Sequence, residues 1–240
     1  MTHIDAQDQY FQQLNQKIRE ERDTEITVDN CLGQRYIGAG MSGKNLLIHG
    51  VPGNDLGCYL NGGNIRVQGN AQDQTGDTMN AGAIVVEGSC GDAAGYAMRG
   101  GKIFIRGNAG YRVGIHMKAY KEQQPLIIIG GEAGSFLGEY QAGGTIIVLG
   151  MNSTRAPMGN LCCAGMHGGR MFVRCEQLPA DLPTQVNTEI ATPEKMASID
   201  GYLSDFCTTF GIPKEQVLAG KFYCITPNTK NPYKALYTFN

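Results

Sequence analysis

The sequence predicts an all-β fold of the solenoid kind: a single-stranded parallel β-helix of about seven coils, with an N-terminal helix and a mostly helical C-terminal extension. Two observations support this prediction. Glycine occurs 34 times in 240 residues, about double the roughly 7% that is usual in soluble proteins. A period of 19 residues runs from Leu32 to Cys175, and each period contains one short apolar run. Repeats of this length bury their apolar faces by stacking on one another.

The rows of this repeat begin at Leu32 and follow without a gap through 32–50, 51–69, 70–88 and 89–107. Row 108–131 carries five extra residues around Ala119 to Gln123, row 132–150 returns to 19 residues, and a last row fits 157–175 after six inserted residues. Two positions hold glycine in every row but the last, where Cys163 and Cys175 replace it. These glycines are Gly38, Gly57, Gly76, Gly95, Gly114 and Gly138 at the seventh position, and Gly50, Gly69, Gly88, Gly107, Gly131 and Gly150 at the nineteenth. We expect them to be structural turn glycines, at corners that need a positive φ or close packing.

Two apolar positions lie two residues apart in each row, which is the spacing of the inward face of a short strand. They are Leu46, Ile65, Ile84, Ile103, Ile127, Ile146 and Met171, and then Ile48, Val67, Val86, Ile105, Ile129, Val148 and Val173. A further apolar position predicts a second wall of the core, and it holds Met41, Leu60, Met79, Met98, Met117 and Met166, with Gln141 as the exception. We interpret these methionines as core filler rather than metal ligands. The pattern gives no reason for Gln141.

The flanks lack the period, so we divide the chain into an N-terminal cap (1–31), the repeat domain (32–175) and a C-terminal extension (176–240). In the cap, residues 5–22 predict a helix with Asp5 as its N-cap, and a strand is expected at 25–28. The apolar face of that helix holds Tyr10, Phe11, Leu14 and Ile18. Because an end coil leaves backbone groups unpaired, we expect both flanks to cap the stack.

In the extension, Thr192-Pro193 is a helix start, and Gly211 followed by Pro213 is a helix end. The apolar stripe between them is Met196, Ile199, Leu203, Phe206 and Phe210. A short helix to about residue 218 and a strand at 222–225 are expected to follow.

Composition excludes several classes of protein. A net charge of −2 and a charged fraction of 18% provide no basic surface for nucleic acid or for anionic lipid. No apolar run approaches the roughly 20 residues of a membrane span, and the polar start does not resemble a secretory signal, so we expect a cytoplasmic protein. The eight cysteines show no C-x-x-C pair and no zinc or iron–sulfur spacing, which favours reduced structural thiols.

Several local motifs have a structural explanation. Gly38-Ala39-Gly40-Met41-Ser42-Gly43 matches a dinucleotide-binding fingerprint and, with Lys44, a phosphate-binding loop. However, the next residues align with a strand rather than a helix, and Asn45 stands where the loop needs Ser or Thr. His49, His116 and His167 occupy different positions of different rows, so no metal or catalytic pair is expected. Asp55, Asp73 and Asp92 are interpreted as turn-forming acids.

A second spacing, G-x-x-G-x-x-x-G, recurs as Gly50/Gly53/Gly57, Gly88/Gly91/Gly95, Gly107/Gly110/Gly114 and Gly131/Gly134/Gly138. This pattern resembles the GXGXG domain, the right-handed β-helix that ends the large subunit of glutamate synthase. The lead-in at 34–38, the run 134–150 and the segment 164–169 are also similar to that domain. The resemblance covers about residues 10–175, and more distantly the chain resembles the β-helical subunit of formylmethanofuran dehydrogenase.

In that family the β-helix is a spacer between catalytic domains, so the resemblance implies no catalytic, cofactor-binding or metal-binding residue. We therefore expect a stand-alone scaffold subunit for glutamate biosynthesis, between separately encoded glutaminase-type amidotransferase and FMN/iron–sulfur synthase subunits. It would be part of an oxidoreductase complex, with a second copy of the chain as a further partner.

Two other interpretations stay open. One is a free-standing enzyme that uses Cys162 or Cys163 as a reactive thiol. The other is a scaffold of another redox complex, of the formylmethanofuran dehydrogenase kind, or a homo-oligomeric adaptor of an unrelated pathway. The outward positions do not choose between them, because Asn64, Arg66, Lys102, Phe104 and Arg106 are mixed in character and predict no single apolar docking stripe.

Overall fold

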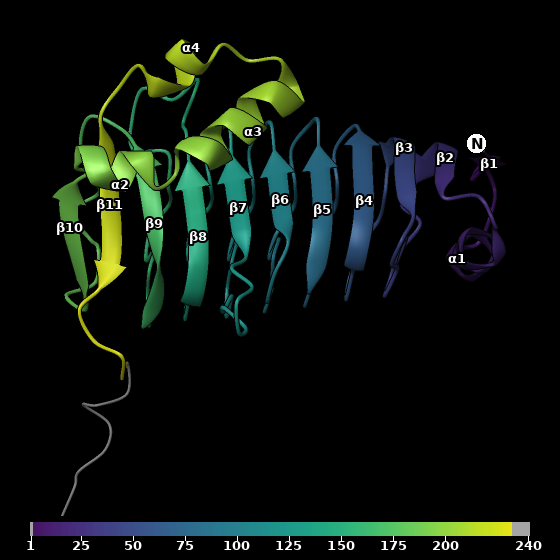
Figure 1. Ribbon diagram of the computed structural model, residues 1–240, viewed down its shortest axis with the longest axis horizontal. Helices are drawn as coiled ribbons and strands as arrows, with labels where there is room; N and C mark the ends of the chain where they lie inside the picture. The colour runs from purple at the N-terminus through teal and green to yellow at the C-terminus, as the bar shows by residue number, and fades with distance from the viewer. Residues whose placement is uncertain (1, 232–240) are drawn as a thin grey trace, which may run out of the picture.

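The computed structural model describes residues 2–231, which form one mostly parallel sheet of 11 strands with four helices beside it (Figure 1). The strands are β1 (Thr2–Asp5), β2 (Glu25–Leu32), β3 (Asn45–Val51), β4 (Asn61–Gln68), β5 (Ala81–Val86), β6 (Lys102–Ile105), β7 (Leu126–Ile129), β8 (Ala142–Val148), β9 (Gly168–Arg174), β10 (Val186–Ile190) and β11 (Phe222–Pro227). Strands β1 to β9 pair in chain order and in parallel, whereas β11 lies antiparallel between β9 and β10.

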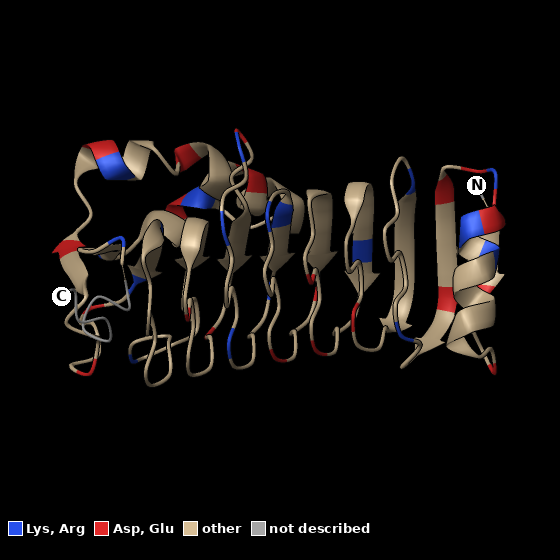
Figure 2. Cartoon of the chain, turned by 90° about the horizontal axis from the view of Figure 1, so that it is seen from below, with Lys and Arg blue, Asp and Glu red and all other residues tan. Residues whose placement is uncertain are grey.

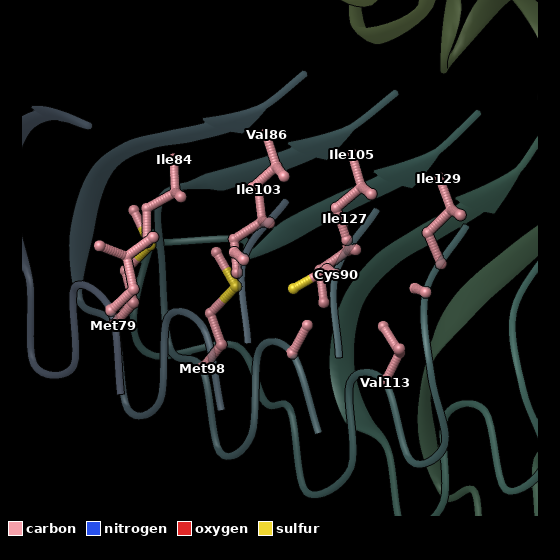
Figure 3. Packing of buried hydrophobic residues seen from close by; sticks show 14 of the residues in the cluster. Met79, Ile84, Val86, Cys90, Met98, Ile103, Ile105, Val113, Ile127 and Ile129 are labelled. Carbon is pink, nitrogen blue, oxygen red and sulfur yellow. The ribbon is translucent and has the colours of Figure 1, made fainter. Parts of the chain in front are cut away.

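The rows pair in the register that the 19-residue period predicts. Leu46 lies opposite Ile65 and Ile65 opposite Ile84, and the same position continues to Met171. Both inward positions are buried in one core, which also contains the residues of the methionine position apart from Gln141 and the partly buried Met41. Figure 3 shows Ile84, Ile103 and Ile127 following one another through this core. Like side chains therefore lie on like side chains along its whole length.

The bend of each row alternates residues of negative and positive φ. In row 70–88, φ is 59° at Gln74, 73° at Gly76 and 49° at Thr78. The N–H groups of Gln74 and Thr78 donate to Asp92 and Tyr96 of the next row, while that of Gly76 donates to Leu56 of the row before, each at 2.8 Å. The alternation thus directs backbone hydrogen bonds to both neighbouring rows, which compensates for the cost of left-handed backbone.

Space explains why the middle of these three positions holds glycine in every row but the last. A Cβ atom on Gly76 would lie 2.5 Å from Cδ1 of Ile103 in the core. Gln74 and Thr78 adopt the same backbone region with side chains. The six seventh-position glycines all have φ between 63° and 73°. At the nineteenth position only Gly50 and Gly150 have positive φ, and close backbone is the other restriction, since a Cβ on Gly69 would collide with the carbonyl oxygen of Gly50.

The N-terminal flank differs from the predicted one. Helix α1 spans Phe11–Glu20, and Asp5 ends strand β1 instead of capping the helix. The Asp5 carboxylate accepts the N–H of Gln7 at 3.0 Å, so its turn lies before the helix. Leu14 and Ile18 are buried as predicted, but Tyr10 is 60% exposed. The strand expected at 25–28 is present and extends to Leu32.

The C-terminal flank contains two helices where one was expected. Helix α2 (Pro193–Ala197) and helix α3 (Asp200–Phe210) are separated at Ser198 and Ile199, while Thr192 Oγ1 accepts the N–H of Lys195 at 3.3 Å as an N-cap. Gly211 ends α3 with φ 63°, and α4 (Lys214–Leu218) follows as predicted. None of the helices within residues 2–231 is long and apolar enough to cross a bilayer.

Helix α3 lies along the outer face of the sheet, a placement that the sequence did not predict for the extension (Figure 1). Leu203, Phe206 and Phe210 form a second core with outward residues of β6 to β9, which are Phe104, Ile128, Ile147 and Phe172. The prediction of no apolar stripe was therefore wrong for this half of the outer face. Strands β11 and β10, which also belong to the extension, continue the sheet beyond β9 of the last row.

Candidate functional site

The glycine loop before β3 does not have the geometry of a phosphate site. Lys44 points its ammonium at the end of α1, where Nζ donates to the carbonyl oxygens of Ile18 at 2.6 Å, Arg19 at 3.0 Å and Glu21 at 2.7 Å. All three donors of the ammonium are thereby used. Strand β3 follows the loop, so no helix N-terminus faces it. The loop fixes the N-terminal helix to the first row.

The two adjacent thiols are core groups. Cys162 and Cys163 have exposures of 1% and 0%, and Cys163 Sγ lies 3.8 Å from Met171 Sδ. Burial raises the pKa of Cys162 to about 11 and raises the pKa of Cys163 further above its usual range. The thiolate that a nucleophilic cysteine needs is disfavoured at both positions.

The three histidines singled out by sequence lie apart and have different partners. His49 Nδ1 lies 2.5 Å from Asp29 Oδ1, and His3 Nδ1 lies 3.1 Å from the other oxygen of that carboxylate. His116 stacks on Tyr140 with ring centroids 5.2 Å apart. His167 Nδ1 contacts the carbonyl oxygen of Gly165 at 2.9 Å. The hydrogen bonds from His49 and His3 lower the pKa of the Asp29 carboxyl group.

The turn acids are part of a side-chain ladder. Asp73 Oδ1 accepts the N–H of Asp92 at 2.9 Å, and Asp92 Oδ1 accepts the N–H of Tyr111 at 2.8 Å. Asn70, Ser89 and Asn108 make the same contact with the row after each of them at another corner. These oxygens satisfy backbone donors of the next row. Asp55 differs, because burial and the neighbouring Asp77 raise the pKa of its carboxyl group.

Gln141 is fully buried at a methionine position. Its Nε2 donates to the carbonyl oxygens of Gly143 at 3.1 Å and Gly144 at 3.3 Å. Its Oε1 has no hydrogen-bond partner among the described residues. The amide therefore fixes Gly143 and Gly144 at the irregular start of β8, where the register with β9 shifts, while one polar atom stays buried without compensation.

The outer face of the sheet divides into a covered and an uncovered half. Sequence reasoning missed the covered stripe, although the residue between the two inward positions is apolar in every row from 89–107 onward. Toward β3 and β4 the outer face carries polar side chains: Asn64 donates to Asn45 at 2.8 Å, and Arg66 pairs with Glu87. Figure 2 shows charged residues of both signs scattered along the stack. Within residues 2–231 no group of three His, Cys, Asp or Glu side chains is arranged to hold a metal ion.

Comparisons with known proteins identify a family, a relative and a similar fold. A family model described as the GXGXG motif matches residues 3–229. The chain is 43% identical over 249 residues to the uncharacterized protein MJ1350 of Methanocaldococcus jannaschii, covering 98% of this chain and 95% of that protein. The fold is similar to that of a chain in the formyltransferase/hydrolase complex from Methylorubrum extorquens, whose crystal structure contains methylofuran. That similarity has a TM-score of 0.62 and 22% identity, over 84% of this chain and 72% of that chain.

Proposed function

Because the chain belongs to the family of the GXGXG motif, we propose that it is a structural subunit of a multi-subunit enzyme in glutamate biosynthesis. It joins a separately encoded glutaminase-type amidotransferase subunit to an FMN/iron–sulfur synthase subunit in the cytoplasm. The observation that carries this proposal is that the family match spans nearly the whole chain, residues 3–229, so that it takes in the repeat and both flanks. Flavin and iron–sulfur chemistry belong to the partners.

The fold suits a spacer. We interpret the stacked rows as a right-handed parallel β-helix of about seven coils, with residues 1–31 and 176–240 as flanking units. Eleven strands at a spacing of about 4.8 Å make a rod of roughly 50 Å. Its core is continuous, and each bend is hydrogen-bonded to the rows on both sides. A rod of this kind holds two partners at a fixed separation.

The regular spacing of glycines along the rows supports a structural role for them in the same proposal. The seventh-position glycines combine positive φ with a core side chain where a Cβ would stand, as at Gly76 and Gly95. The nineteenth-position glycines allow adjacent rows to approach. We assign the twelve glycines to the rod and none of them to a ligand.

A second candidate is a structural subunit of a redox complex of the formylmethanofuran dehydrogenase kind. The likeness to a chain of the formyltransferase/hydrolase complex favours it. That likeness, at 22% identity, concerns the fold alone. The third interpretation, a free-standing cysteine enzyme, gains no support, since both adjacent thiols are buried with raised pKa values.

Reconstitution from separately purified subunits tests the proposal. Glutamate formation is measured with glutamine and, as the matched control, with ammonia as the nitrogen donor. A spacer that joins glutaminase to synthase raises the glutamine-dependent rate and leaves the ammonia-dependent rate of the synthase unchanged. Equal glutamine-dependent rates with and without this chain would contradict the proposal.

A further inference from the structure

A line of backbone bridges along one corner of the stack ends at Met158. This corner ladder joins Ala71, Cys90, Ala109, Ala133 and Met158 in parallel. Each of its inner members donates its N–H to the first residue of the next row and accepts at its carbonyl from the third residue of that row. At Ala133 these bonds run to the Pro157 carbonyl at 3.0 Å and from the Gly159 N–H at 3.1 Å.

Met158 repeats the position of Ala133 in the last row, but no row follows it. Among residues 2–231, its N–H has no acceptor and its carbonyl has no donor. An unpaired donor and acceptor at the end of a ladder form a template for another extended chain. Strands β11 and β10 complete the sheet beyond β9, but the corner stays open.

The side-chain ladder ends at the same edge. Ser135 Oγ accepts the N–H of Asn160 at 3.1 Å, just as Asp92 does for Tyr111 earlier in the stack. Asn160 holds the same row position and is exposed. Its amide oxygen is therefore available to a backbone N–H of an added segment.

This edge forms the floor of a groove of about 970 Å³. Its walls come from the insertion at 151–156, from residues 174–179, where the chain leaves the last row, and from the turn at 219–221. Two ion pairs lie in these walls, Arg155 with Glu132 at 3.5 Å and Lys221 with Glu176 at 3.9 Å.

Arg174 also lines this groove, and it is a cation without an ion pair among residues 2–231. Its Nη1 donates to the Gln216 carbonyl at 3.4 Å, and no carboxylate of residues 2–231 lies within ion-pair distance of it. Partial burial lowers the pKa of the guanidinium group. A half-buried cation without a carboxylate is stabilised by an incoming one.

We propose that this groove binds an extended segment of a partner subunit, which pairs its backbone with Met158 as an added row and places a carboxylate beside Arg174. The proposal rests on the proposed function, because it requires a protein partner. It assigns the docking point to the corner of the last row where Met158 and Asn160 line the same groove as Arg174.

Amide hydrogen exchange of the full-length chain tests the proposal without any substitution. In the free chain, the Met158 N–H is expected to exchange at least tenfold faster than the Ala133 N–H of the same ladder. In the complex with the glutaminase-type and FMN/iron–sulfur subunits, Met158 becomes as protected as Ala133. Protection of Met158 already in the free chain overturns the proposal, because the chain itself then occupies the groove.

Substitutions provide a second test of the proposal. Arg174→Gln is expected to weaken binding of the partner at least tenfold, and Asn160→Ala to weaken it severalfold. Arg99→Gln, at an exposed arginine in another row, is the matched control and leaves affinity unchanged. Circular dichroism checks that each variant folds.

The outcomes separate the two proposals. A stable complex in which Met158 stays unprotected and Arg174→Gln binds normally overturns the groove as docking point and leaves the proposed function intact. If the wild-type chain binds neither subunit, the proposed function fails, and the groove proposal fails with it.

Discussion

The ammonium of Lys44 lies 2.6 Å from the carbonyl oxygen of Ile18, and this contact joins the first glycine loop to the last turn of α1. Carbonyl groups at a helix C-terminus have no intrahelical donor and carry the negative end of the helix dipole. A residue that sequence motifs assign to phosphate binding thus performs helix capping.

Replacement of this lysine tests its capping role. Lys44→Met removes three hydrogen bonds from a charged donor, and we expect a loss of about 1–3 kcal/mol in the free energy of unfolding. Urea denaturation measures the change. Lys118→Met, at an exposed position, serves as the control with an expected change below about 0.5 kcal/mol. Equal free energies of unfolding for the two variants would contradict the capping role.

The bend predicts opposite effects of glycine and alanine at positions two residues apart. Gly95→Ala introduces a Cβ that collides with Ile127 Cδ1 at a φ of 70° and is expected to destabilise the fold by about 2–4 kcal/mol. Ala97 has a φ of 48°, so Ala97→Gly is expected to stabilise it by about 0.5–1 kcal/mol. Thermal denaturation of both variants distinguishes them. Destabilisation by Ala97→Gly would show that φ strain is not the relevant cost.

The thiols predict how stability depends on alkaline pH. Burial raises the pKa of Cys90 to about 11, whereas an unfolded thiol titrates near 8.5. Between these values the unfolded state binds fewer protons than the folded state, so stability falls as pH rises. Each pH unit in that window costs about 1.4 kcal/mol for this group.

A substitution isolates the contribution of Cys90 to this slope. The corner ladder holds alanine at Ala71, Ala109 and Ala133, so Cys90→Ala fits the position. The variant is expected to lose stability between about pH 9 and pH 11 less steeply, by about 1.4 kcal/mol per pH unit. Parallel pH profiles of variant and wild type would contradict the assignment.

The second core predicts that α3 depends on one side chain. The ring of Phe206 lies 5.7 Å from that of Phe104 and 4.8 Å from that of Phe210, and it is fully buried. Phe206→Ala is expected to cost about 3–5 kcal/mol. Hydrogen exchange should then rise in α3 while the amides of β3 to β5 keep their protection. Uniform loss of protection would mean that stack and helix unfold as one unit.

Much of the repeat could be predicted from the sequence, because strand alternation and a 19-residue period determine the register. The inward positions from Leu46 to Met171 pair as expected. The left-handed residues beside the seventh-position glycines could not be predicted, since Gln74 and Thr78 carry side chains that reveal nothing of their φ. Glycine at the seventh position is required because a Cβ atom has no room there. A positive φ alone would not require glycine, since Gln74 and Thr78 also have it.

The flanks were predicted less well because tertiary contacts decide them. Ile199 is fully buried in the second core, and Arg170 Nη1 donates to Ser198 Oγ at 2.7 Å. These contacts stabilise the break between α2 and α3, although the apolar stripe of the sequence continues through it. Strand β10 is mostly exposed and lacks alternation, so only its pairing with β11 identifies it. The groove was not predictable, because three segments distant in sequence form its walls.

Native mass spectrometry of the co-expressed subunits tests the central claim most directly. We expect one species that contains this chain, the glutaminase-type subunit and the FMN/iron–sulfur subunit, and no association of the two catalytic subunits when this chain is omitted. Association of those two without it, or recovery of this chain by itself from the co-expression, would contradict its role as the structural subunit that joins them.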